Sequence, residues 1–287
     1  MKKTIYRAAL IAMMASLFII NVNLAASEMD DRIESTAKES YVFKTYLQGD
    51  DIDIASKDGA VTLTGTVAEE TRKTLAQETV ASLPGVISVD NKLEVKGEAL
   101  PVYSDAWLIA KVKSTLFFHR NVSAAKTEVL AKDGIITLRG ETASEAHKDL
   151  ATEYAKDVEG VRDVKNEMTV VTAATKPDEK LKAKKMDAQV KPGEKTMGQK
   201  MGDVVDDTTG YIDDASITAM VKTTLMYHRS TSAINTTVKT NEGVVSLGGK
   251  AANAAEKDLA TKLVSDVYGV KSVVNNMEIE TAKAATK

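Results

Sequence analysis

The sequence predicts an α+β protein built from three tandem copies of one small module. An eight-residue motif occurs three times, and each copy is followed by glycine, valine and asparagine at the same spacing. Self-similarity at a fixed spacing is the signature of a repeat architecture. We expect each module to run helix–strand–strand–helix–strand, with a three-stranded mixed sheet covered by two helices.

The repeated motif begins at an acidic residue followed by glycine and ends at a second glycine. In every copy a third glycine lies 20 residues after the second one. Copies two and three align without a gap, whereas copy one, aligned with Leu47 opposite Leu116, is about six residues shorter before its first strand. We assign structural roles in turns and helix ends to Gly59, Gly65, Gly85, Gly134, Gly140, Gly160, Gly243, Gly249 and Gly269.

The second copy predicts each element in order. Apolar residues at helical spacing (Leu108, Val112 and Leu116) indicate an opening helix. Alternating residues over 127–131 indicate a strand, and Asp133-Gly134 is a hairpin signal because glycine adopts positive φ without steric cost.

The second half of the copy is a crossover from the second strand to the third. Thr142 and Glu145 indicate a capping box that opens a second helix, and Gly160 suits its end. Residues 164–170 alternate as a strand with one buried face. Such a small module buries little surface, so packing against a neighbour would stabilise it.

These patterns place module 1 at 38–95, module 2 at 105–171 and module 3 at 213–280. Residues 172–212 are rich in charge and contain proline and glycine, which predicts a flexible linker. We therefore expect module 3 to move independently of the other two.

The first 26 residues are typical of a secretory signal peptide. Basic residues precede an apolar run of thirteen residues, and small residues follow, so cleavage is expected after Ala25 or Ala26. A membrane-spanning helix is the alternative, but it needs about 20 apolar residues. We predict an exported, periplasmic protein.

The composition excludes several classes of protein. The absence of cysteine excludes disulfides, thiolate metal sites and a lipid anchor on an N-terminal cysteine. A net charge of −3 argues against nucleic acid as a partner. No spacing suggests a catalytic set, a phosphate-binding loop, a cofactor or a metal site, so we predict no enzymatic activity.

The repeated core Gly-Val-Val-Ser/Thr-Leu-x-Gly, the 20-residue gap and the ending Gly-Val-x-x-Val-x-Asn resemble the BON domain family. The resemblance implies a non-catalytic periplasmic protein that binds phospholipid surfaces and supports the envelope under osmotic stress. Some relatives are lipoproteins, and this chain lacks the cysteine that such an anchor requires.

We take Trp107, off the apolar stripe of the opening helix, as the leading candidate for lipid contact, because tryptophan suits head-group depth. Packing of Trp107 between modules 1 and 2 is the alternative. The histidines at equivalent positions, each followed by arginine, predict a basic loop for phosphate head groups, with an ordinary solvated loop as the alternative. The full candidate set is Trp107, Lys111, Phe118, His119, Arg120, His228 and Arg229.

A second function from a different class stays open. A repeated sheet with exposed edges can add a strand from another envelope protein. The alternative to a lipid-binding protein is therefore a chaperone-like holdase or adaptor in the periplasm.

Overall fold

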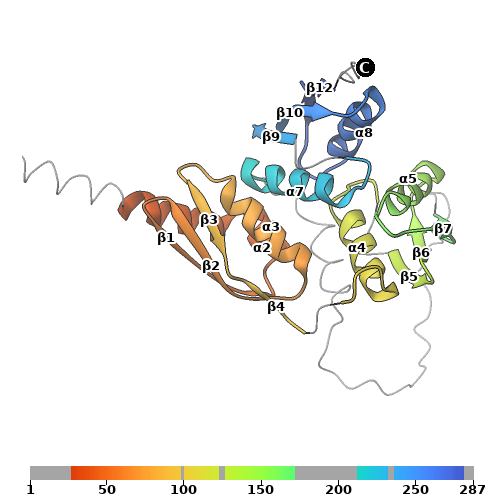
Figure 1. The fold of residues 1–287 in the computed structure, drawn as a ribbon, viewed down its shortest axis with the longest axis horizontal. Coiled ribbons are helices and arrows are strands. Elements are labelled where there is room, and N and C mark those ends of the chain that lie inside the picture. Colours follow the sequence, from red (N-terminus) through yellow and green to blue (C-terminus); the bar gives the residue numbers. More distant parts are fainter. Residues whose placement is uncertain (1–26, 98–99, 123–126, 172–211, 232–235, 281–287) are drawn as a thin grey trace, which may run out of the picture. The chain divides into compact units, whose positions relative to one another are not determined.

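The computed structural model describes residues 27–97, 100–122, 127–171, 212–231 and 236–280. They form two compact units, one with module 1 and the other with modules 2 and 3 (Figure 1). The expected signal-peptide cleavage site and almost all of the expected linker lie outside the described residues.

All three modules have an opening helix, a hairpin of two strands, a second helix and a last strand in two pieces, and module 1 has one additional short helix in the described residues. Module 1 has a helix over 27–39, then α2 (Tyr41–Thr45), β1 (Asp51–Lys57), β2 (Ala60–Val67), α3 (Glu70–Ala81), β3 (Ser88–Asn91) and β4 (Glu94–Val95). Module 2 has α4 (Asp105–Phe117), β5 (Thr127–Lys132), β6 (Ile135–Thr142), α5 (Glu145–Lys156), β7 (Asp163–Asn166) and β8 (Thr169–Val170). Module 3 has α7 (Asp214–Tyr227), β9 (Thr236–Asn241), β10 (Val244–Ala251), α8 (Ala254–Ser265), β11 (Ser272–Asn275) and β12 (Glu278–Ile279).

The predicted mixed sheet is confirmed, with its last strand split into two short pieces. In module 2, β6 is central: it pairs antiparallel with β5 and parallel with β7 and β8. The split follows from Asn166, whose side-chain oxygen accepts a hydrogen bond from the Met168 amide at 3.0 Å. The Met168 amide is thereby directed to Asn166, while the Glu167 amide still donates to the Leu138 carbonyl of β6 at 2.8 Å.

The same asparagine fastens the second helix to the sheet in every module. In module 2 the Asn166 side-chain amide donates to the Lys148 carbonyl and to the Thr152 hydroxyl, both at 2.8 Å. Asn91 and Asn275 make the corresponding bonds in modules 1 and 3. The asparagine that marks each repeat is therefore a structural residue.

The hairpin turn of each module is held by an aspartate at the start of the opening helix. Asp214 accepts hydrogen bonds from the amides of Glu242 and Gly243 at 2.7 and 2.8 Å. Asp30 and Asp105 do the same in modules 1 and 2. Both central residues of each turn have positive φ, as in a type I′ hairpin.

This aspartate corrects the alignment of module 1. The hydrogen-bonded aspartate and glycine are 29 residues apart in all three modules, so the first module has no deletion. Tyr41, not Leu47, is the equivalent of Leu116, and the opening helix covers 27–39, ahead of the expected start at 38. The error arose because this helix shares few residue types with its counterparts.

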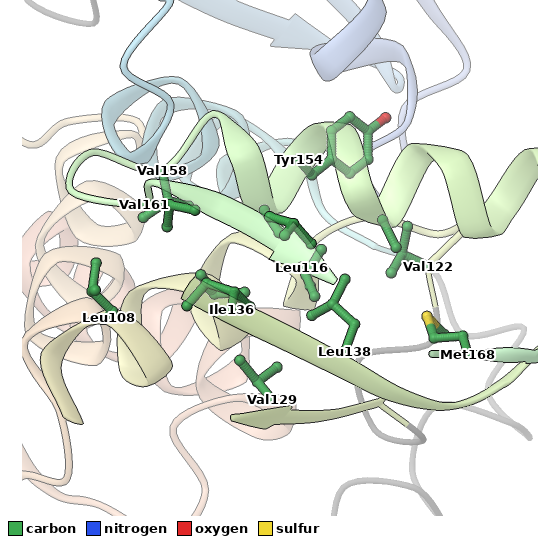
Figure 2. Packing of buried hydrophobic residues seen from close by; sticks show 14 of the residues in the cluster. Leu108, Leu116, Val122, Val129, Ile136, Leu138, Tyr154, Val158, Val161 and Met168 are labelled. Atoms are coloured by element: carbon green, nitrogen blue, oxygen red, sulfur yellow. The ribbon is translucent and has the colours of Figure 1, made fainter. Parts of the chain in front are cut away.

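The core of module 2 lies between the sheet and the two helices (Figure 2). Leu108 and Leu116 from α4 pack with Ile136 and Leu138 from β6, all fully buried. Tyr154 lies at the edge of this core, and Leu263 of module 3 belongs to the same buried cluster. The core of module 2 therefore continues into module 3.

Candidate functional site

Modules 2 and 3 meet at a surface that we call the junction. It is formed by residues 118–121 and 228–230, which follow the opening helices, and by the ends of α5 and α8 with Tyr154, Asp157 and Asp266. This contact overturns the expectation that module 3 moves independently. That expectation rested on the composition of the linker, which carries no information on whether the surfaces of the two modules bind each other.

The backbone contacts of the junction are reciprocal. The Arg120 amide of module 2 donates to the Asp266 carbonyl of module 3 at 2.9 Å, and the Arg229 amide of module 3 donates to the Asp157 carbonyl of module 2 at 3.0 Å. Each module therefore offers the same backbone groups to the other, as in an interface with two-fold symmetry.

The side chains follow the same reciprocal pattern. Nδ1 of His228 lies 2.8 Å from Oδ2 of Asp157, and Nδ1 of His119 lies 3.4 Å from Oδ2 of Asp266. The two histidine rings are 5.8 Å apart, and Tyr154 stacks on His119 with ring centroids 3.9 Å apart. The pair with Asp157 has a normal hydrogen-bond length and the pair with Asp266 is longer, so the two halves differ in geometry.

The histidine rings are 0% and 1% exposed, for His119 and His228 respectively. The expected basic loop thus turns inward, and Phe118 is buried beside it. Arg120 and Arg229 keep about half of their side chains in solvent while they contact the opposite module. The alternative of a solvated loop is wrong as well, because the loop is the centre of an interface.

Burial sets the ionisation of these groups. Desolvation lowers the pKa of His119; the neighbouring Asp266 carboxylate opposes this shift, and the electrostatic interaction with His228 adds to it. Burial by itself would raise the pKa of Asp157, but hydrogen bonds from His228 and Ser230 outweigh it and hold that pKa below its ordinary value. Desolvation and the neighbouring Asp266 raise the pKa of Tyr154, which stays protonated.

Module 1 lacks the chemistry of the junction. Counted back from the hairpin glycine, Lys44 stands where module 2 has His119, and it forms an exposed ion pair with Glu39. Counted from the helix-end glycine, Ser82 stands where module 2 has Asp157. Sequence comparison of the copies could have found this signal, since only modules 2 and 3 share the histidine and the aspartate.

A second surface lies at the start of α4. Trp107 is partly buried and packs edge-on against Tyr103, with ring centroids 5.3 Å apart. Lys111 lies 5.5 Å from the Trp107 ring and 3.9 Å from the ring of Tyr227 in module 3. The described contacts of Trp107 therefore belong to the unit of modules 2 and 3.

The segment before α4 is exposed and apolar. Leu100, Val102 and Tyr103 are 46%, 64% and 52% exposed. Tyr103 has a φ of 65°, which is rare for a bulky residue, and its hydroxyl donates to Glu159 at 2.7 Å. A shallow hollow beside it is lined by Gly134, Gly160 and Arg162, with Asp133 and Glu159. We call Leu100, Val102, Tyr103 and Trp107 the α4 patch.

All nine glycines singled out in the sequence have positive φ. Among the described residues no helix is long and apolar enough to cross a bilayer, and no three acidic or histidine side chains are grouped to hold a metal ion.

The family model of the BON domain matches residues 29–97, 104–172 and 213–281, which is most of the chain. The chain therefore belongs to the BON domain family, with three copies of the domain.

Among individual proteins, osmotically-inducible protein Y of Escherichia coli (strain K12) is 28% identical over 190 residues, which cover 66% of this chain and 78% of that protein. The 21 kDa hemolysin of Actinobacillus pleuropneumoniae is 29% identical over 116 residues, which cover 39% of this chain and 59% of the hemolysin.

Two solved structures of CdsD, a structural protein of the type III secretion system of Chlamydia trachomatis, were also found. The first is 14% identical, with 89% of this chain and 94% of the other covered and a TM-score of 0.23. The second, a C-terminal domain, is 13% identical, with 88% and 98% covered and a TM-score of 0.21.

Proposed function

We propose that this protein is a non-catalytic, periplasmic envelope protein that binds phospholipid membrane surfaces and supports the envelope under osmotic stress. The similarity to osmotically-inducible protein Y supports the cellular role. The α4 patch supports the membrane role, because exposed apolar and aromatic side chains gather there beside basic ones.

The chemistry of the α4 patch suits the interface of a bilayer. Leu100 and Val102 offer apolar surface, and the rings of Tyr103 and Trp107 combine an apolar body with a polar edge that favours head-group depth. Lys111 and Arg162 lie next to it and supply positive charge, worth about 1 kcal/mol each near an anionic surface.

The junction takes three of the original candidates out of this role. Phe118, His119 and His228 are buried between modules, so lipid cannot reach them while the junction is closed. Trp107 and Lys111 remain as lipid contacts, and Val102 and Tyr103 join them. Arg120 and Arg229 stay half exposed at the rim of the junction.

The test uses Trp107, the only tryptophan, as its own reporter. We expect its emission to shift to the blue when the mature protein meets phosphatidylglycerol vesicles, with a smaller change on phosphatidylcholine vesicles. Val102→Asp should weaken co-sedimentation with the anionic vesicles at least tenfold. Val274→Asp, at an exposed valine of module 3, is the matched control and should bind as the unmodified protein does.

No blue shift with anionic vesicles, or equal binding by Val102→Asp and the unmodified protein, would contradict the proposal. Suppressed aggregation of an unfolded client without lipid, together with absent vesicle binding, would favour the holdase or adaptor instead.

A further inference from the structure

The junction contains buried titratable groups that have no part in the proposed contact with a membrane. Isolated buried charges are costly, so buried histidines stay neutral or acquire a partner. Within the described residues neither ring nitrogen of His119 has a hydrogen-bond partner, and Nε2 of His228 has none. The nearest acceptor for a proton on His119 is the Asp266 carboxylate, which lies 3.4 Å from Nδ1 and already accepts hydrogen bonds from Tyr154 and Asn121.

We propose that the junction is an acid-sensitive latch, in which protonation of His119 separates module 3 from module 2. The proposal stands on the position of this ring: it is fully buried at a surface between two modules, stacked on Tyr154 and 5.8 Å from a second histidine. It does not depend on membrane binding.

The charges that face His119 compensate a proton there only in part. Asp266 lies 3.4 Å from Nδ1, but this carboxylate already accepts from the Tyr154 hydroxyl at 3.0 Å and from the Asn121 side chain, and the Arg120 guanidinium is 3.8 Å away. Its negative charge is thus shared among three other groups. His228 on the other side is a base as well, so a charge there repels one on His119.

The charges around His228 form the other half of the junction. Asp157 faces Nδ1 at 2.8 Å and also accepts from the Ser230 hydroxyl, and the Arg229 guanidinium lies 3.7 Å from it. At the rim, Lys262 of module 3 pairs with Glu153 of module 2 at 2.6 Å. That pair is exposed and contributes little. Nδ1 of His228 thus has a carboxylate at normal hydrogen-bond distance, whereas the carboxylate that faces His119 is farther away and shared with other donors, which makes His119 the sensitive position.

The sign of the response follows from the lowered pKa of His119. The closed junction binds fewer protons than the open one, so its stability is complete above pH about 6.5, the ordinary value for histidine, and falls as the pH drops below it. One proton gained on opening raises the ratio of open to closed junction by up to about 30-fold between pH 7.5 and pH 5. The lowered pKa of Asp157 acts in the same direction, but only at much lower pH.

The absence of cysteine permits a direct measurement of opening in the mature, full-length protein. Lys165→Cys in β7 and Lys239→Cys in β9 place one spin label on an exposed position of each module. We expect a narrow distance distribution between the labels at pH 7.5. At pH 5 a broad, longer distribution should replace much of it and revert on neutralisation.

His119→Phe is the decisive variant. Phenylalanine keeps the stacking on Tyr154, cannot take up a proton and leaves no described hydrogen bond broken. We expect the narrow distribution to persist at pH 5. His147→Phe, at a partly buried histidine in α5 away from the junction, is the matched control and should open like the parent protein.

Three outcomes would overturn the latch. One is an unchanged distance in the parent protein between pH 7.5 and pH 5. Another is a His119→Phe protein that opens over the same pH range as its parent. The third uses the unsubstituted chain, in case the variant does not fold: an imidazole of His119 that titrates by NMR at or above the ordinary histidine pKa of about 6.5.

Discussion

The hydroxyl of Tyr154 in module 2 donates a hydrogen bond of 3.0 Å to Oδ2 of Asp266 in module 3, and both groups are buried. This bond joins two modules separated by a linker of some forty residues, so a contact distant in sequence ties the core of one module to the helix end of the next. Tyr154 therefore has two roles: its ring packs in the core of module 2, and its hydroxyl forms a hydrogen bond across the junction.

The first prediction concerns this hydroxyl. Tyr154→Phe should lower the free energy of unfolding of module 2 by about 1–2 kcal/mol, because a buried, charged carboxylate loses a donor. Urea unfolding followed by Trp107 fluorescence reports module 2. Tyr103→Phe removes an exposed hydroxyl bonded to Glu159 and should cost less than about 0.5 kcal/mol. Equal losses in the two variants would contradict the assigned role of Tyr154.

The second prediction concerns Asp157. Asp157→Asn should destabilise module 2 by about 2–3 kcal/mol at pH 7, because His228 and Ser230 lose a charged acceptor. The lowered pKa means that the carboxylate stabilises the protein above pH about 4 and that this contribution is lost as the pH falls through the lowered value. The difference between variant and parent should therefore shrink in acid.

Asp149→Asn is the matched control for Asp157, because it lies on the same helix at an exposed position. It should change the free energy of unfolding by less than about 0.5 kcal/mol at any pH. A pH-independent loss for Asp157→Asn would show that its charge is not what the junction uses.

The third prediction tests the asparagine shared by all three modules. Asn275→Ala removes donors to the Lys257 carbonyl and the Thr261 hydroxyl and the acceptor of the Met277 amide. We expect module 3 to lose about 2–3 kcal/mol and the Met277 amide to exchange with solvent at least tenfold faster. The neighbouring Asn276→Ala, at an exposed position, should leave the exchange rate of that amide unchanged.

The fourth prediction tests the aspartate that holds the hairpin turn. Asp214→Ala should cost module 3 about 1–2 kcal/mol, because two turn amides lose their acceptor. Hydrogen exchange of the Gly243 amide measures the effect locally. Asp258→Ala on α8, at an exposed position, serves as the control. Unchanged exchange at Gly243 in Asp214→Ala would contradict the role given to the aspartate.

The residues alone were sufficient for the number of modules, the hairpin turn, the crossover to the last strand and the three-stranded mixed sheet. Alternation at residues 127–131 and the glycine turn are local patterns, and they depend on the chain within one module. The local pattern does not decide which residue of module 1 is equivalent to Leu116: Leu47 fits the helical spacing, but the structure places Tyr41 there. Several alignments of apolar residues satisfy helical spacing equally well. The hydrogen bond that the Gly59 amide donates to Asp30 fixes the alignment, because it joins residues 29 positions apart.

The pairing of modules 2 and 3 could not be read in the same way. His119 and His228 each precede an arginine and follow a helix, which is the pattern of an exposed basic loop. This local pattern does not indicate which surface of another module will cover the histidine. The carboxylates that face these rings, Asp157 and Asp266, stand far along the chain and on opposite modules. Hydrophobic periodicity and turn formation depend on interactions within a few residues, so the local sequence determines them. An interface between folded modules depends on the complementarity of whole surfaces, and these surfaces exist only once each module has folded.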